Sequence, residues 1–362
     1  MHITNLPNEL ILHIFQSTPD LPTLLALSSS CKHFHKILTS HRLPTLYLAA
    51  ESQYGPLAIA TRVVTHNESQ LPHIPRPAPS QSFALLKQLV AVGRTAEKWI
   101  TIYPGLKWKG ERSADRRFLN EEECYRLRRA CYRIWLYTLA FHTRAYPRYT
   151  RRQLDVMRTR ALLLRPWSSQ QLAELLDLHD VFREVLHSHV CPSNGTVLRR
   201  HKQRFPDDPF PLISSATVKK CEQQSTAYSQ AFFHSTPHVS HLSMAKNHAQ
   251  AYAAVEGWGD DISQYYVVED MLKVNPGQLV RLYESVTGNL ELLESTNTVI
   301  MPGNPKGVVE HFVAGLGDWF ENNGETLCET VGIVILDRGG DVEALREGIE
   351  EGWEGIARRE DD

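Results

Sequence analysis

Residues 3–38 read ITNLPNELILHIFQSTPDLPTLLALSSSCKHFHKIL, and this stretch carries the clearest pattern in the chain. After Pro7, the apolar residues Leu10, Ile11, Ile14 and Phe15 recur at threes and fours, which predicts a first amphipathic helix. A second run at helical spacing continues through Leu24, Leu27, Ser28, Cys31, Phe34, Ile37 and Leu38. Helices this short cannot bury their apolar stripes against one another alone, so part of this surface should meet the rest of the chain or a partner.

The order of residues in this stretch resembles an F-box. The resemblance rests on Leu6-Pro-x-Glu9-Leu10-Ile11-x-x-Ile14-Phe15, then Asp20-Leu21, Leu24-x-x-Leu27 and Ser30-Cys31-Lys32-x-Phe34. It covers about the first tenth of the chain. Pro22, which should interrupt the middle segment, and Ser30, where the family prefers an aliphatic residue, depart from the family pattern. The alternative from the residues alone is an amphipathic helical hairpin belonging to the core of a larger domain.

The resemblance implies a binding module rather than an enzyme. An F-box docks on a Skp-type adaptor and so joins a cullin–RING ubiquitin ligase of the SCF type. By that resemblance, the body of this chain would hold an unknown protein substrate while other subunits transfer ubiquitin. The adaptor-binding residues expected by matching to the motif are Leu6, Pro7, Glu9, Leu10, Ile14, Phe15, Leu24, Leu27, Cys31 and Phe34.

Composition fits a soluble globular protein. The chain has 362 residues, of which 42% are hydrophobic and 22% charged, with a formal net charge of −2. No apolar run approaches the ~20 residues that a membrane span requires, and the N-terminus does not read as a secretory signal. We therefore expect a cytoplasmic or nuclear protein that makes no membrane contact. The six cysteines are scattered without a C-x-x-C pair, which favours reduced thiols.

Helical periodicity continues along most of the chain, which predicts a mainly α fold. We divide it into the F-box module at 1–42, a helical extension and proline-rich joint at 43–82, a basic and aromatic-rich helical domain at 83–190, and a mixed, mainly helical region with an acidic tail at 191–362. The joint is assigned to residues 71–82 because proline at that density excludes helix. Helices are also predicted at 216–233 and 244–255. The β-branched runs at 298–301 and 331–336 fit either short strands or buried helical turns.

A basic zone from Lys107 to Arg165 suggests a second function. Its many arginines lie among tyrosines and Trp135, a mixture that suits phosphate contacts and base stacking in a nucleic-acid-binding protein. The same pattern arises from ordinary solvated helix faces, and the acidic tail from Asp341 onward offers intramolecular charge complementarity. We therefore keep nucleic-acid binding as the alternative and regard it as the less favoured one.

Residue patterns for catalysis or metal binding are weak. His187-x-His189-x-Cys191, with His201 beyond, has zinc-ligand types, but its spacing does not converge the side chains and no second Cys/His pair follows. There is no G-x-S-x-G, no phosphate-binding glycine loop and no dinucleotide fingerprint. The sequence accordingly predicts no catalytic residue, no metal ligand and no cofactor.

Overall fold

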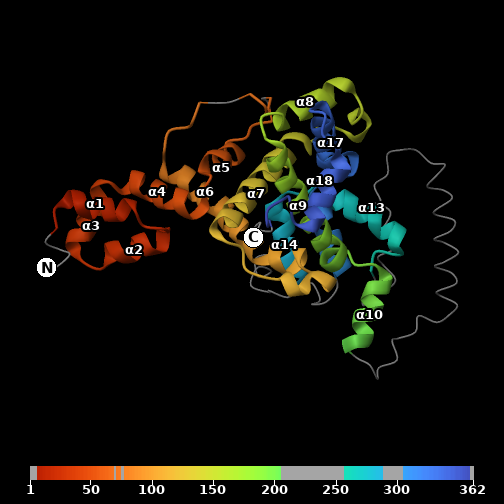
Figure 1. Cartoon of the computed structure of the whole chain (residues 1–362), viewed down its shortest axis with the longest axis horizontal. Coiled ribbons are helices and arrows are strands. Elements are labelled where there is room, and N and C mark those ends of the chain that lie inside the picture. Colours follow the sequence, from red (N-terminus) through yellow and green to blue (C-terminus); the bar gives the residue numbers. More distant parts are fainter. Residues whose placement is uncertain (1–5, 69–70, 75–76, 205–256, 288–304, 359–362) are drawn as a thin grey trace.

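The computed structural model describes residues 6–68, 71–74, 77–204, 257–287 and 305–358, and within these ranges all regular structure is helical (Figure 1). The prediction of a mainly α fold is confirmed. A strand at 331–336 is wrong, because these residues lie in α17 (Leu327–Asp337). Val331, Val334 and Ile335 fall on one buried helix face, so the β-branched run serves helix packing. The predicted strand at 298–301 and the predicted helices at 216–233 and 244–255 lie outside the described residues.

Three short helices of similar length, α1 (Asn8–Gln16), α2 (Leu21–Ser29) and α3 (Lys32–Ser40), form a module at one end of the molecule (Figure 1). Helix α2 begins with a capped turn, because the Asp20 carboxylate accepts a hydrogen bond from the Thr23 amide at 2.6 Å. Pro22 stands in the first turn of α2, where its missing N–H is harmless. Pro22 therefore starts a helix, whereas the sequence led us to expect an interruption.

A helical connection joins this module to the rest of the chain. Helix α4 (Arg42–Tyr54) contacts α1, α2 and α3 at one end and α6 (Phe83–Lys107) at the other. Tyr54 packs on Gly93 of α6, where a Cβ atom would lie only 2.5 Å from the Tyr54 ring. The Tyr54 carbonyl also accepts a hydrogen bond from the Tyr132 hydroxyl at 2.8 Å. Helix α4 therefore connects the module to the packed core of the body.

The proline-rich stretch at 71–82 was expected to join the N-terminal module to the body, but it lies elsewhere in the fold. It connects α5 (Leu57–Val64) to α6, after α4 and α5 have already packed against the body. Pro72 is buried, and its carbonyl accepts a hydrogen bond from the Arg62 guanidinium at 2.8 Å. The connection between module and body thus lies in α4, and the proposed domain boundaries stay a prediction.

The centre of the body is built from α6, α7 (Glu121–Phe141) and α9 (Ser169–Val185), which pack on one another. Both α7 and α9 begin with a capping box, at Asn120 with Glu123 and at Ser168 with Gln171. Large apolar side chains fill the space between the three helices, including Trp99 and Phe182, whose ring centroids are 4.4 Å apart. These helices form the scaffold on which the remaining elements lie.

The remaining elements surround this scaffold. They are the short helical turns η2 (Gly110–Asp115) and η3 (Arg148–Thr150), the π-helical turn η4 (Leu186–Val190), and the helices α8 (Leu154–Leu164), α10 (Asn194–Arg204), α13 (Asp261–Met271), α14 (Pro276–Thr287), α15 (Pro305–Ala314), α16 (Asp318–Asn322) and α18 (Val342–Glu351). Helix α17 packs on α8, α9 and α18.

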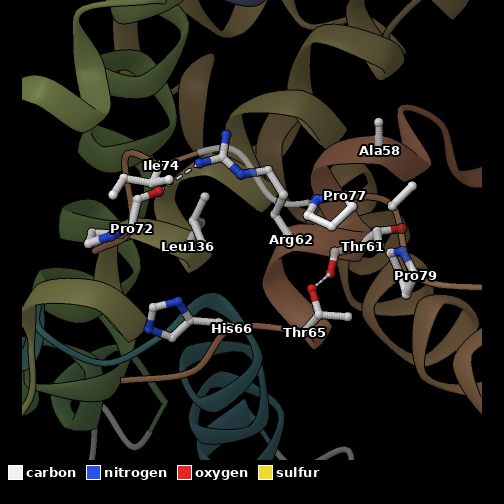
Figure 2. A pocket seen from close by; sticks show the side chains of 11 residues that line it. Ala58, Thr61, Arg62, Thr65, His66, Pro72, Ile74, Pro77, Pro79 and Leu136 are labelled. Carbon is white, nitrogen blue, oxygen red and sulfur yellow. Dashed lines mark hydrogen bonds between the residues drawn. The ribbon is translucent and has the colours of Figure 1, made fainter. Parts of the chain in front are cut away.

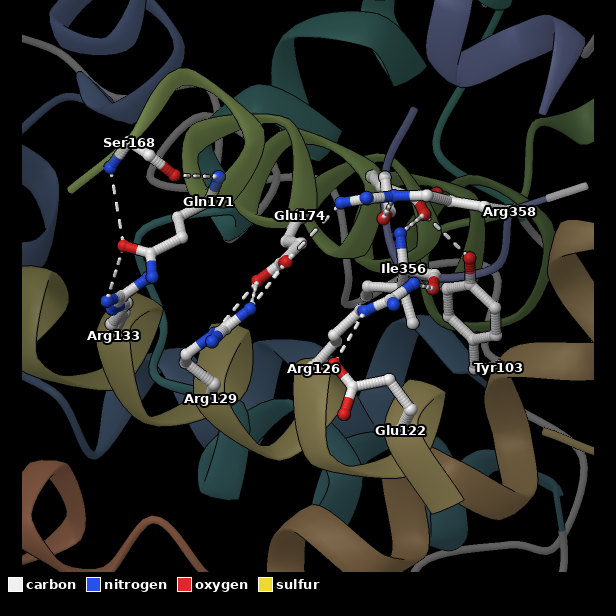
Figure 3. Close-up of polar contacts among 12 residues, drawn as sticks. Tyr103, Glu122, Arg126, Arg129, Arg133, Ser168, Gln171, Glu174, Ile356 and Arg358 are labelled. Carbon is white, nitrogen blue, oxygen red and sulfur yellow. Dashed lines mark hydrogen bonds and ion pairs between the residues drawn. The ribbon is translucent and has the colours of Figure 1, made fainter. Parts of the chain in front are cut away.

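A buried polar network holds the C-terminal segment against the scaffold (Figure 3). Glu174 of α9 accepts three hydrogen bonds from the Arg129 guanidinium of α7, at 2.6, 2.8 and 3.0 Å. Beyond α18, the Ile356 amide donates to the Asp177 carboxylate at 2.8 Å, and Arg358 lies 3.8 Å from Glu174. Because Ile356 is fully buried, the end of the described chain is part of the core.

Candidate functional site

The inner face of the N-terminal module is a closed apolar core. Ile11, Phe15, Leu24 and Phe34 are all buried there, and the rings of Phe15 and Phe34 meet edge to face with centroids 5.8 Å apart. Three of the residues predicted to bind an adaptor, namely Phe15, Leu24 and Phe34, therefore have no surface to offer a partner. In this structure they hold the helices of the module together.

The outer face of α1 presents a different stripe. Pro7 is exposed, Leu10 is 50% exposed and Ile14 is half-buried, and their spacing of three and four residues places them on one side of the helix. Glu9 is exposed beside this stripe, and Leu6 is half-buried against the core. A 50% exposed leucine is available to be covered, so this stripe is the part of the predicted set that can contact a partner directly.

Helices α2 and α3 supply the rest of the predicted set. Leu27 is half-buried on α2, while Leu25, which the motif did not single out, is 48% exposed. The sequence gives no signal that separates Leu25 from Leu24, because adjacent leucines of one helix can both be buried, as Leu175 and Leu176 of α9 are. Cys31 caps α3 by accepting a hydrogen bond from the Phe34 amide at 3.4 Å. Its described role is therefore local.

Basic side chains of the module gather on α3. Lys32, His33, His35 and Lys36 are all exposed there, next to the cap at Cys31. The carboxylates in the described part of the module, Glu9 and Asp20, lie at the starts of the other two helices. A partner with acidic side chains facing α3 would meet complementary charge.

The body carries a shallow cavity of about 310 Å³ between α5, Leu136 of α7 and the proline-rich stretch (Figure 2). Thr61, Arg62 and Thr65 line it together with Pro72, Pro77 and Pro79 of the proline-rich stretch. Its lining among the described residues contains no Cys, Asp or Glu side chain. The cavity can therefore accept an apolar side chain beside a guanidinium.

The arginines of the basic zone are largely engaged within the chain. They pair with carboxylates as Arg117–Glu123, Arg126–Glu122, Arg128–Glu97, Arg129–Glu174, Arg148–Asp270, Arg151–Glu329 and Arg165–Asp337. The aromatic residues Tyr132 and Tyr137 of this zone are fully buried. None of these pairs uses the acidic tail from Asp341 onward. The expected charge complementarity within the chain is therefore present in the described residues, but the arginines pair with carboxylates that precede the tail.

Two other sequence features can be placed. His187 and His189 lie in the π-helical turn η4, where the Gln264 amide donates to the carbonyls of His187 and Cys191, both at 2.8 Å. The His189 ring lies against Tyr283.

No helix in the described ranges has both the length and the apolar content needed to cross a bilayer.

Comparison with known families identifies the module. Residues 3–43 match the family model of the F-box-like domain. The resemblance drawn from the motif is thereby confirmed, over almost the same residues. Neither the curated proteins nor the solved structures contain a match to the chain.

Proposed function

We propose that this chain, with its N-terminal F-box-like domain, is the substrate-receptor subunit of an SCF-type cullin–RING ubiquitin ligase. Its module would bind a Skp-type adaptor, and through that adaptor a cullin, while the helical body holds a protein substrate. The observation that carries the proposal is a matched F-box-like domain whose core is closed and whose outer stripe at Pro7, Leu10 and Ile14 remains uncovered by the described residues. The proposal implies a cytoplasmic or nuclear location.

The way α4 connects the module to the body supports this role. The Gln53 side chain of α4 accepts a hydrogen bond from the Leu21 amide at 3.1 Å, which fixes the start of α2. At the other end, the Gly55 carbonyl accepts from Arg128 of α7 at 3.0 Å. A receptor works by holding its substrate at a defined place near the transferred group, so a packed connection increases effective concentration.

A single exposed leucine tests the proposal. Leu10→Asp places a charge on the outer stripe without touching the buried residues of the module. If an adaptor covers Leu10, the variant should weaken the complex by roughly 10–100-fold, since burying a leucine contributes about 1.5–3 kcal/mol. The measurement is co-purification of the co-expressed full chain with a Skp-type adaptor.

The matched control is Leu154→Asp on α8 of the body, where the leucine is 67% exposed. This variant should retain the adaptor at the wild-type level. Full retention by a folded Leu10→Asp chain would exclude the outer stripe as the binding surface. Equal loss by both variants would show a general effect of added charge.

A further inference from the structure

A cluster of three metal-ligating side chains lies in the body, far from the F-box-like domain. His179 comes from α9, Glu325 from the loop between α16 and α17, and Cys328 from the first turn of α17. One ligand atom from each residue lies within 4.8 Å of the other two. The cluster joins segments almost 150 residues apart in sequence, as the separation of 149 between His179 and Cys328 shows. No short spacing motif can reveal such a site.

The distance between the thiol and the imidazole fits a shared ion. The Cys328 Sγ is 3.4 Å from the His179 Nδ1, and two such ligands on one tetrahedral zinc ion lie about 3.5 Å apart, given the usual Zn–S and Zn–N bond lengths. The Glu325 Oε1 is 3.7 Å from the other ring nitrogen, Nε2. Because one ion takes a single ring nitrogen, the thiol or the carboxylate would shift toward the nitrogen that binds the ion, within a cluster whose ligand atoms already lie within 4.8 Å of one another.

Burial makes the cluster chemically unusual. The side chains of His179 and Glu325 are 2% and 7% exposed, and the His179 Nε2 is a buried polar atom with no hydrogen-bond partner in the structure. A buried carboxylate is costly unless a cation lies beside it. Among the described residues, Glu325 forms its ion pair with His179. A cation at the centre of the cluster would compensate this buried carboxylate.

The neighbouring Arg183 does not supply that charge in full. Its guanidinium donates to Asp180 at 2.8 Å and to Glu269 at 3.1 Å, so two other carboxylates share it. With a thiolate and a carboxylate as ligands, a dication would leave the site neutral. Thiolate, imidazole and carboxylate together are the ligand types of zinc, and the thiolate disfavours magnesium and calcium.

We propose that His179, Glu325 and Cys328 form a zinc site that fastens α17 to α9. Three protein ligands leave one tetrahedral position for water, and the half-buried Cys328 side chain provides the route of entry. The ion would link the C-terminal helices to the scaffold, so its expected effect is on the stability of the body. The inference is independent of the adaptor-binding role.

The test uses the full chain, stripped with a chelator and then titrated with zinc chloride. We expect about one zinc ion per chain, measured by colorimetric release, and a rise in the thermal midpoint on binding. Cys328→Ser and Glu325→Gln should each weaken zinc binding by more than the roughly 10–100-fold typical of losing an outer-shell partner. Glu325→Gln retains an oxygen that can accept from the Leu327 amide, so it serves if Cys328→Ser does not fold.

A matched control separates this site from other histidines of the chain. His187→Ala with His189→Ala removes the zinc-ligand types of the π-helical turn and should leave stoichiometry and midpoint shift unchanged. Absence of zinc binding by the folded wild-type chain would overturn the proposal. Binding that persists in the cluster variants, or that disappears only in the His187/His189 variant, would overturn it as well.

Discussion

At the residue scale, His142 shows how burial sets an ionisation state. It follows the end of α7, is 5% exposed, and its Nδ1 lies 3.0 Å from the Lys273 carbonyl. Burial, with the positive charges of Lys273, His179 and Arg160 as lesser causes, lowers the pKa of His142 to about 3, against the backbone hydrogen bond that acts in the opposite direction. The folded protein therefore keeps this imidazole neutral at any pH above about 3.

This burial predicts a loss of stability in acid. Between pH 6.5 and about 3, the unfolded chain binds a proton at His142 that the folded chain does not bind. The free energy of unfolding should fall as the pH drops through this window, by up to about 1.4 kcal/mol per pH unit from this residue. Urea unfolding of wild type and His142→Gln across the window measures the difference.

Above pH 7 the gap in stability between the two proteins should be constant, because His142 is then neutral in both states. A gap that does not change between pH 7 and pH 4 would contradict the assignment of His142 as a buried neutral group. The variant retains an amide that can donate to the Lys273 carbonyl, so the comparison isolates titration.

The sequence could not predict which of two neighbouring residues on a helix faces the core. The motif indicates that Leu24 and Phe15 matter, and both do lie in the module, but it does not say whether they face the core or a partner. Leu24 is buried while Leu25 is 48% exposed, and only the packing of α2 on α3 and α4 decides between them. Periodicity fixes which residues share a face but not what covers it.

At the element scale, the contact between α7 and α9 organises the body. The two helices meet through an ion pair, Arg129 with Glu174, whose carboxylate is fully buried and accepts three hydrogen bonds from the guanidinium. Breaking such a pair leaves a buried charge without compensation, and this typically costs about 3–5 kcal/mol. Arg358 lies 3.8 Å away and can compensate in part.

We expect Arg129→Met to lower the free energy of unfolding by about 3 kcal/mol, at the lower end of the usual range because Arg358 remains. The double variant Arg129→Met with Glu174→Leu should lie closer to wild type than Arg129→Met does, since no charge is then left buried. Thermal and urea denaturation give both values. A double variant less stable than the single variant would contradict the explanation by an uncompensated buried charge.

Element types were predictable wherever helical spacing was long and caps were present. Asn120 and Glu123 form the capping box that begins α7, and Pro147 lies a few residues beyond its end at Phe141. The β-branched run at 331–336 left a strand and a buried helical turn both open, because Val and Ile also fill the inner face of a buried helix, as they do in α17. The His179, Glu325 and Cys328 cluster was beyond sequence reasoning, since it depends on how α17 packs against α9.

At the scale of the whole molecule, the F-box-like domain lies at one end and the helical body at the other, with α4 packed against both (Figure 1). This arrangement leaves the outer stripe of α1 away from the scaffold helices. It also explains why proline content was a poor guide to the connection, because the buried face of α4 (Ala49, Ala50 and Tyr54) is what joins the two parts. In the proposed receptor role, the chain would present the adaptor and the substrate on separate surfaces.

The most direct test of the central claim is the stoichiometry of the complex between the full chain and a purified Skp-type adaptor. Size-exclusion chromatography with light scattering should give a single species of one chain and one adaptor, and Leu10→Asp should return both proteins to their separate elution positions. Separate elution of the wild-type chain, with its helical content intact by circular dichroism, would contradict the proposed role.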